Sequence, residues 1–115
     1  MDRLSSNQYY KLNLSKEWLI SNNFRYNSML SDDEEDVYTY RFPVHKNGGF
    51  TILECEISVY LQSKDIVIEC FEYGTRDRYA PFYYVEYGNY DTILQSIWNQ
   101  INKELKKLGI KKKKG

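Results

Sequence analysis

Strict alternation of apolar and polar side chains in the middle of the chain constrains the fold most. In FTILECEISVYLQ, residues 50–62, the apolar residues are Leu53, Cys55, Ile57, Val59 and Leu61, and Glu54, Glu56, Ser58, Tyr60 and Gln62 stand between them. Successive side chains of a β-strand point to opposite faces of its sheet, so this pattern predicts a strand with one buried face and one polar face. The apolar face then needs a second layer to cover it.

Three further segments have the composition and alternation of strands. They are VYTYRFPVH (residues 37–45), DIVIECFEY (residues 65–73) and YAPFYYVEY (residues 79–87). The first has Tyr38, Tyr40, Phe42 and Val44 on one side, which is its expected buried side. In the last segment Val85 favours burial of one side and Phe82 favours burial of the other, so its register stays open.

Turn residues join the first three of these strands. A two-residue turn at Asn47-Gly48 predicts a hairpin that pairs Phe42 with Leu53. A two-residue turn at Ser63-Lys64 likewise sets apolar residues of the next two strands opposite each other. Residues that are directly opposite in an antiparallel pair share a face, so both turns are consistent with one apolar side of the sheet.

Two helices flank the strands. Residues 91–109, DTILQSIWNQINKELKKLG, carry an apolar stripe at helical spacing that consists of Ile93, Leu94, Ile97, Trp98, Ile101, Leu105 and Leu108. Gly109 is the expected end of this helix. A shorter helix is predicted to begin near Ser15, to bury Trp18 and Leu19, and to stop at Asn22-Asn23.

These elements predict an α+β fold. It is a four-stranded antiparallel meander in the order 1-2-3-4, with an N-terminal helix and a long C-terminal helix on one face. The two prolines, Pro43 and Pro81, fall in the first and last strands, which places those strands at the edges of the sheet. The 115 residues are expected to form one domain, residues 1–110, followed by a basic tail, residues 111–115.

Charge is segregated along the chain, although the formal net charge is zero. Residues 1–102 hold nine Lys and Arg against fifteen Asp and Glu, whereas residues 103–115 hold seven Lys against Glu104. The sequence has no apolar run of membrane-spanning length and its first residues lack a signal-peptide core. We therefore expect a cytoplasmic protein with no membrane partner, whose cysteines, Cys55 and Cys70, are free thiols.

The sequence contains no recognisable catalytic motif. Phosphate-binding loops, dinucleotide fingerprints and metal-spaced Cys/His clusters are absent, and His45 is the one histidine. Both cysteines fall on the predicted core face, where a thiol is usually inert. We expect a non-enzymatic protein that needs no cofactor or metal.

Carboxylates line the predicted polar face of the central strands. Glu54, Glu56 and Glu69 could act in acid-base chemistry, as in a small hydrolase. Together with the acidic run SDDEED (residues 31–36), they could also imitate nucleic-acid phosphates. The ordinary alternation of a half-exposed sheet explains the same glutamates without any function.

The segment EYGTRDRYAPFYYVEYGNYD, residues 72–91, repeats EYG and contains seven aromatic rings. Turn chemistry accounts for its Gly, Asn and Asp residues, and an Arg-Asp pair could simply steady the turn. Tyrosine next to arginine is favoured at interaction surfaces. We therefore predict that a protein partner, or a second copy of this chain, is bound by Tyr73, Arg76, Arg78, Tyr79 and Tyr83.

The basic tail gives an alternative function. Nucleic-acid phosphates would be contacted by Lys111, Lys112, Lys113 and Lys114. In this alternative, Arg76 and Arg78 add phosphate contacts and the tyrosines stack on bases. Deletion of residues 110–115 is expected to weaken such binding.

In size and composition, with YGTRDRYAPFYYVEYGNYD and WLISNNF as its most characteristic stretches, the chain resembles small uncharacterised proteins of phages and integrative elements in low-GC Gram-positive bacteria. The resemblance implies an accessory protein that modulates or inhibits a host protein. It favours a binding module over an enzyme.

Overall fold

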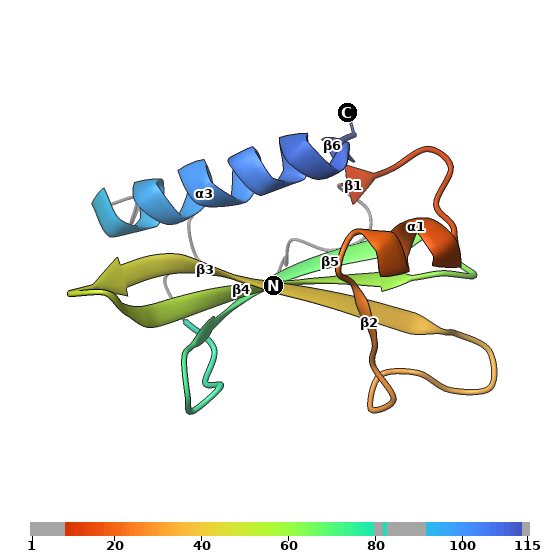
Figure 1. Ribbon diagram of the computed structural model, residues 1–115, viewed down its shortest axis with the longest axis horizontal. Coiled ribbons are helices and arrows are strands. Elements are labelled where there is room, and N and C mark those ends of the chain that lie inside the picture. Colours follow the sequence, from red (N-terminus) through yellow and green to blue (C-terminus); the bar gives the residue numbers. More distant parts are fainter. Residues whose placement is uncertain (1–8, 80–81, 83–91, 114–115) are drawn as a thin grey trace.

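The computed structural model describes residues 9–79, 82 and 92–113, which form a helix layer on an antiparallel sheet (Figure 1). The elements are β1 (Tyr9–Tyr10), α1 (Lys16–Ser21), β2 (Arg25–Tyr26), β3 (Val37–Asn47), β4 (Phe50–Tyr60), β5 (Asp65–Glu72), α3 (Thr92–Leu108) and β6 (Lys111–Lys112). Strands β2 to β5 form a four-stranded sheet in sequential order, and β1 pairs with β6. The predicted α+β class, with a four-stranded antiparallel sheet and a long C-terminal helix, is confirmed.

The strands of this sheet differ in one member from those predicted. The first three predicted strands are β3, β4 and β5. The fourth strand of the sheet is β2, a two-residue strand that pairs with the outer side of β3. The predicted last strand, residues 79–87, lies mostly outside the described residues. Of its described positions, Tyr79 is not in a strand, and Phe82 is helical, buried and stacked on Trp98 with ring centroids 5.1 Å apart.

The register of the β3–β4 hairpin is shifted by two residues from the prediction, so Phe42 lies opposite Cys55 and not opposite Leu53. The two-residue turn consists of Gly48 and Gly49, whose φ angles are 58° and 84°. Such turns require positive φ at both positions, which glycine adopts without steric cost. An even shift leaves the side chains from Val37 to Pro43 on their predicted faces, and the pairing becomes irregular around His45.

The β4–β5 connection is also longer than predicted. Tyr60 pairs with Asp65, so a four-residue loop replaces the expected two-residue turn, and Lys64 adopts a φ of 68° within it. Ile57 therefore lies opposite Ile68, whereas a two-residue turn at Ser63-Lys64 would have set it opposite Cys70. The apolar faces again coincide, because this shift is even as well.

Both helices lie on the same side of the sheet (Figure 1). The α1 helix begins where predicted, because the Ser15 hydroxyl oxygen accepts a hydrogen bond from the Trp18 amide at 3.1 Å. Gly109, with φ 74°, follows the end of α3. The core side of α3 is formed by Leu94, Ile97, Ile101, Leu105 and Leu108. The prediction was wrong for Ile93, which is 39% exposed at the first turn.

The chain after α3 continues the fold through β6. Tyr9 pairs with Lys112, Tyr10 pairs with Lys111, and the side chain of Ile110 is buried. The predicted deletion of residues 110–115 would therefore remove a core residue and a strand together with the lysines. Substitution of the lysines is the cleaner test of their function.

Pro43 lies on a part of β3 that has no outer neighbour among the described residues. The β2 strand pairs only with Tyr38 and Thr39, so β3 extends beyond it. A proline lacks the amide donor of a ladder, and this position makes that loss tolerable. None of the helices in the described part of the chain has the length and hydropathy of a membrane-spanning segment.

Candidate functional site

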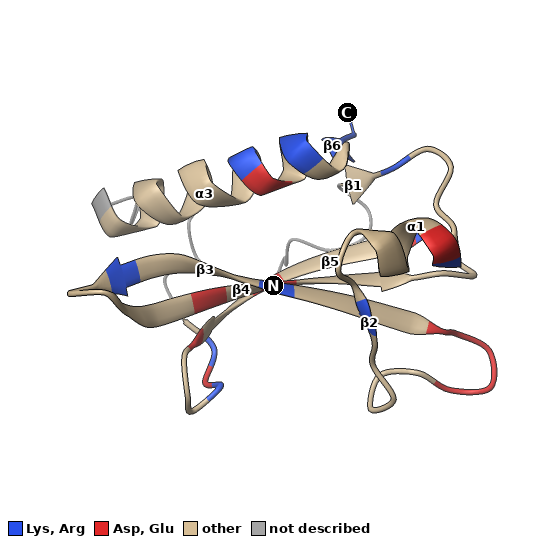
Figure 2. Cartoon of the chain, in the orientation of Figure 1, with Lys and Arg blue, Asp and Glu red and all other residues tan. Residues whose placement is uncertain are grey.

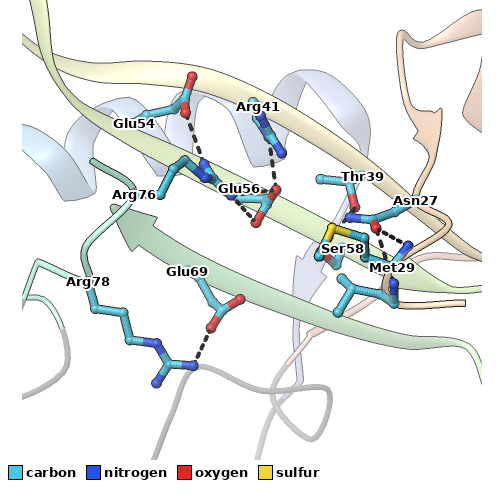
Figure 3. Close-up of polar contacts among 11 residues, drawn as sticks. Asn27, Met29, Thr39, Arg41, Glu54, Glu56, Ser58, Glu69, Arg76 and Arg78 are labelled. Carbon is cyan, nitrogen blue, oxygen red and sulfur yellow. Dashed lines mark hydrogen bonds and ion pairs between the residues drawn. The ribbon is translucent and has the colours of Figure 1, made fainter. Parts of the chain in front are cut away.

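The face of the sheet away from the helices carries a cluster of ion pairs (Figure 3). Alternation along β4 and β5 places Glu54, Glu56 and Glu69 on this face, as predicted. The turn after β5 folds back over them. Arg76 donates to Glu54 at 3.1 Å and to both carboxylate oxygens of Glu56 at 3.1 and 3.2 Å, and Arg78 lies 3.1 Å from Glu69. The glutamates of β4 and β5 and the arginines of the following turn, which lie in separate segments of the sequence, thus form one ion cluster.

Glu56 is the centre of this cluster. Its side chain is only 6% exposed, and Arg41 on β3 donates to it from Nε at 2.9 Å in addition to Arg76. A carboxylate this buried is stable only when it is paired and hydrogen-bonded, since burial removes its hydration. Three arginines face three glutamates, so the cluster has no net formal charge. That balance removes the main support for a phosphate-imitating surface on this face.

Backbone geometry explains how Arg76 reaches the sheet. Arg76 adopts a left-handed conformation with φ 66°, and its amide donates to the Glu72 carbonyl at 3.0 Å. The Glu72 amide in turn donates to the Asp77 carbonyl at 2.7 Å, which closes the turn. The guanidinium carbon also lies 4.3 Å from the centre of the Phe71 ring, a cation–π contact. Arg76 is therefore ion-paired to the glutamates of the sheet.

A second site lies at the end of the sheet beside the β3–β4 hairpin. The exposed apolar side chains there are Phe50 (75% exposed), Ile52 (43%), Tyr73 (58%) and Ile93 (39%). Tyr73 is fixed beside Ile52 because its amide donates to the Ile52 carbonyl at 2.9 Å. We call these four residues, with the half-buried Tyr79, the hairpin-end surface.

An open pocket of about 360 Å³ lies in the hairpin-end surface. Its lining includes Ile52, Tyr73, Tyr79 and Ile93 from this surface, and also His45. The side chains come from β3, β4, the turn after β5 and the first turn of α3. The pocket thus depends on the tertiary fold and not on one segment.

The structure separates the predicted binding residues into two groups. Tyr73 and Tyr79 line the pocket, whereas Arg76 and Arg78 belong to the ion cluster. Tyr83 lies outside the described residues.

Sequence reasoning missed Phe50, Ile52 and Ile93. The first two share the face of Glu54 by alternation, so an apolar pair on the side expected to be polar was the available signal. Ile93 was assigned to the core stripe of its helix.

Both cysteine thiols are buried on the core face of the sheet. Burial raises the pKa of the Cys70 thiol to about 12, and burial, followed by the charge of the neighbouring Cys70, raises that of Cys55. Both thiols are therefore protonated at neutral pH and poor nucleophiles. Within residues 9–79, 82 and 92–113, no three His, Cys, Asp or Glu side chains are grouped as metal ligands.

Comparisons with known proteins identify the fold and give no activity. No family model matches the sequence, and no curated protein matches it. A crystal structure of a DUF1831 family protein from Lactobacillus plantarum is similar, with a TM-score of 0.60 over 96% of this chain and 98% of that chain. The two sequences are 6% identical, so the similarity extends to the fold alone.

Proposed function

We propose that this protein is a non-enzymatic protein-binding module and that the hairpin-end surface is its binding site. One observation carries the proposal: exposed apolar side chains from three segments, β4, the turn after β5 and the start of α3, line a single pocket. Scattered apolar residues are normal on a protein surface, but a contiguous group beside a pocket is typical of an interaction site. Tyrosine favours such sites because its ring gives a large contact area at low entropic cost.

The surroundings of the pocket fit a protein partner. The polar residues Glu72 and Thr75 also line it, and the Arg76–Glu54 ion pair belongs to the adjoining turn and strand. Protein interfaces commonly combine apolar contacts with neighbouring polar groups in this way. We infer that the partner inserts an aromatic or large aliphatic side chain at the centre.

We further propose that this is a cytoplasmic accessory protein of phage or mobile-element origin that modulates or inhibits a host protein. Size, composition and the absence of a catalytic motif in the sequence support this role. Self-association through the same surface is the second form that the proposal takes.

The proposal is tested by comparing two double variants of a tagged protein in affinity purification with quantitative mass spectrometry. Ile52→Ser with Tyr73→Ser disrupts the hairpin-end surface. Leu12→Ser with Met29→Ser removes two apolar side chains that are 70% and 93% exposed elsewhere, and serves as the matched control.

We expect at least one protein, or a second copy of the chain, to be retained by the wild type and the control but lost from the first variant. Loss of a binding hot spot weakens affinity by about 30-fold or more. If every protein recovered is retained equally by both variants, and sedimentation shows the same oligomeric state for both, the proposal is wrong.

A further inference from the structure

Lysines from three separate segments gather at the end of the molecule where α3 finishes (Figure 2). We call them the lysine surface, which consists of Lys11, Lys103, Lys106, Lys107, Lys111, Lys112 and Lys113. The sequence grouped the lysines of residues 103–115, which span the end of the predicted helix and the tail. The fold adds Lys11 from the N-terminal segment, and it holds two of the tail lysines in β6.

Two contacts bring the segments together. The β1–β6 pairing sets Tyr10 opposite Lys111, and Lys11 is the next residue along the chain. A Cβ atom built on Gly109 would lie 3.7 Å from Lys11 Nζ, so this amine is adjacent to the end of α3. Lys11 is also held by the Trp18 ring, whose centre is 4.5 Å away.

The helix presents its lysines away from the core. Lys103, Lys106 and Lys107 are three and four residues apart, which places them on one face of α3. All three are exposed, whereas Ile101 and Leu105 on the other side are buried. The lysines therefore face solvent together.

Carboxylates neutralise little of this charge. Among the described residues, one lysine of this surface makes an ion pair: Lys107 Nζ lies 3.9 Å from Glu104 Oε1. Glu104 is turned toward the sheet, where it accepts a hydrogen bond from the Tyr40 hydroxyl at 2.9 Å. The ion cluster on the opposite face is balanced, whereas the lysine surface concentrates positive charge that, within the described part of the chain, is ion-paired only at Lys107.

The helix macrodipole explains only part of this arrangement. Cations stabilise the last turn of a helix, which accounts for Lys106 and Lys107. It does not account for Lys103 one turn earlier or for Lys11 on another segment. A polyanionic ligand accounts for all of them.

We propose that the lysine surface binds the phosphate backbone of nucleic acid. A membrane-bound basic helix would insert its apolar stripe between lipids, but the stripe of α3 is already buried against the sheet. The exposed groups of the surface are lysine amines, which contact phosphates as point charges and do not read bases. The affinity is therefore independent of the nucleotide sequence and depends strongly on the salt concentration.

The test is fluorescence anisotropy of the full chain with duplex DNA, duplex RNA and single-stranded DNA across a salt series. The helix variant carries Lys103→Gln, Lys106→Gln and Lys107→Gln. The control carries Arg25→Gln, Lys46→Gln and Lys64→Gln, which remove the same charge from exposed positions elsewhere. Thermal unfolding confirms that both variants are folded.

We expect the wild type and the control to bind at low salt with the same steep salt dependence. The helix variant should bind at least tenfold more weakly, and its slope of log affinity against log salt should fall by about 2 to 3, since each duplex phosphate contributes about 0.9. The three nucleic acids then show which backbone is preferred.

Two results would overturn the proposal. One is the absence of binding to all three nucleic acids at low salt, with or without binding to vesicles of anionic lipid. The other is an equal loss in the helix variant and the control, which would mean that only the overall charge matters. Neither result bears on the hairpin-end surface, which contains no lysine.

Discussion

The centre of the sheet is closed to water on both faces, but by different means. On the helix side, Cys55, Ile57 and Ile68 are fully buried under helices. On the other side, Glu56 and Ser58 are 5% and 2% exposed, although the described segments that lie over them are loops (Figure 1). The centre of the first face is closed by apolar packing, whereas the centre of the second is closed by polar groups that are paired with one another.

The difference shows what a loop needs in order to cover a sheet. The turn after β5 lies on Glu56 because Arg76 supplies two charged hydrogen bonds to it. The loop after β2 reaches Ser58 through a chain in which the Asn27 amide donates to Thr39 at 3.1 Å, and the two hydroxyls lie 3.3 Å apart. The buried polar residues of this face, Thr39, Glu56 and Ser58, each have a hydrogen-bond partner, so burial is possible without a helix.

The largest loss of stability is expected from a substitution on the helix side of the sheet. Ile57→Ala should lower the free energy of unfolding by about 2 to 5 kcal/mol, because it leaves a cavity under the helices. Ile52→Ala removes the same atoms from a residue that is 43% exposed on the other face, and should cost less than about 1 kcal/mol. Urea unfolding measures both. Equal losses would contradict the assignment of the two faces.

The next largest loss of stability is expected from a substitution in the ion cluster. Arg76→Ala should cost about 1 to 2 kcal/mol, which is less than a fully buried pair because the Arg76 side chain is 35% exposed. Arg25 is exposed and makes no ion pair within the described part of the chain, so Arg25→Ala should change stability by less than about 0.5 kcal/mol. A similar loss in the two variants, measured by urea unfolding, would argue against a structural role for the cluster.

The loop after β2 gives a smaller effect. The Asn27 side-chain oxygen accepts from the amides of Met29 and Leu30, each at 3.1 Å, while its amide group donates to Thr39. Asn27→Ala should cost about 1 kcal/mol and speed hydrogen exchange at Met29 and Leu30. Ser28→Ala is the neighbouring control. Unchanged exchange in Asn27→Ala would mean that other contacts hold the loop.

The smallest effect concerns Tyr40 and appears at high pH. Burial, then the hydrogen bond to Glu104, raises the pKa of Tyr40 from 10.0 to about 12. The folded state thus keeps this proton more tightly than the unfolded state. The contribution to stability is present below pH 10 and is lost as the pH rises toward 12.

Tyr40→Phe should make this high-pH loss shallower and cost about 0.5 to 1 kcal/mol at neutral pH, where one hydrogen bond is missing. Urea unfolding across this pH range measures both quantities. Burial also raises the pKa values of Tyr9 and Tyr60, so part of the loss should persist. An identical pH profile in the variant would show that Tyr40 does not contribute.

The alternation of the strands and the helical spacing of apolar residues correctly predicted the regular elements of the fold. The buried faces of β3, β4 and β5 and the limits of α1 and α3 agree with the sequence pattern. The strand pairings were shifted by two residues, because loop length depends on which residues accept positive φ, as Gly48 and Gly49 do. The β2 strand has two residues and therefore no period to detect.

The candidate sites depend on contacts that periodicity does not encode. Arg76 and Glu56 are 20 residues apart, and their pairing follows from the left-handed backbone of one turn residue. Aromatic composition pointed to Tyr73 and Tyr79. Ile93 joined them only because the first turn of α3 lies at the end of the sheet.

A double-mutant cycle between Arg76 and Glu56 tests most directly whether Arg76 stabilises the folded protein through its ion pair with Glu56. The four proteins are the wild type, Arg76→Ala, Glu56→Gln and the double variant, and urea unfolding gives their stabilities. We predict a coupling energy of about 1 kcal/mol or more, as expected for residues in one ion-pair network. Additive losses, within about 0.3 kcal/mol, would contradict the ion cluster and would leave Arg76 available to a partner.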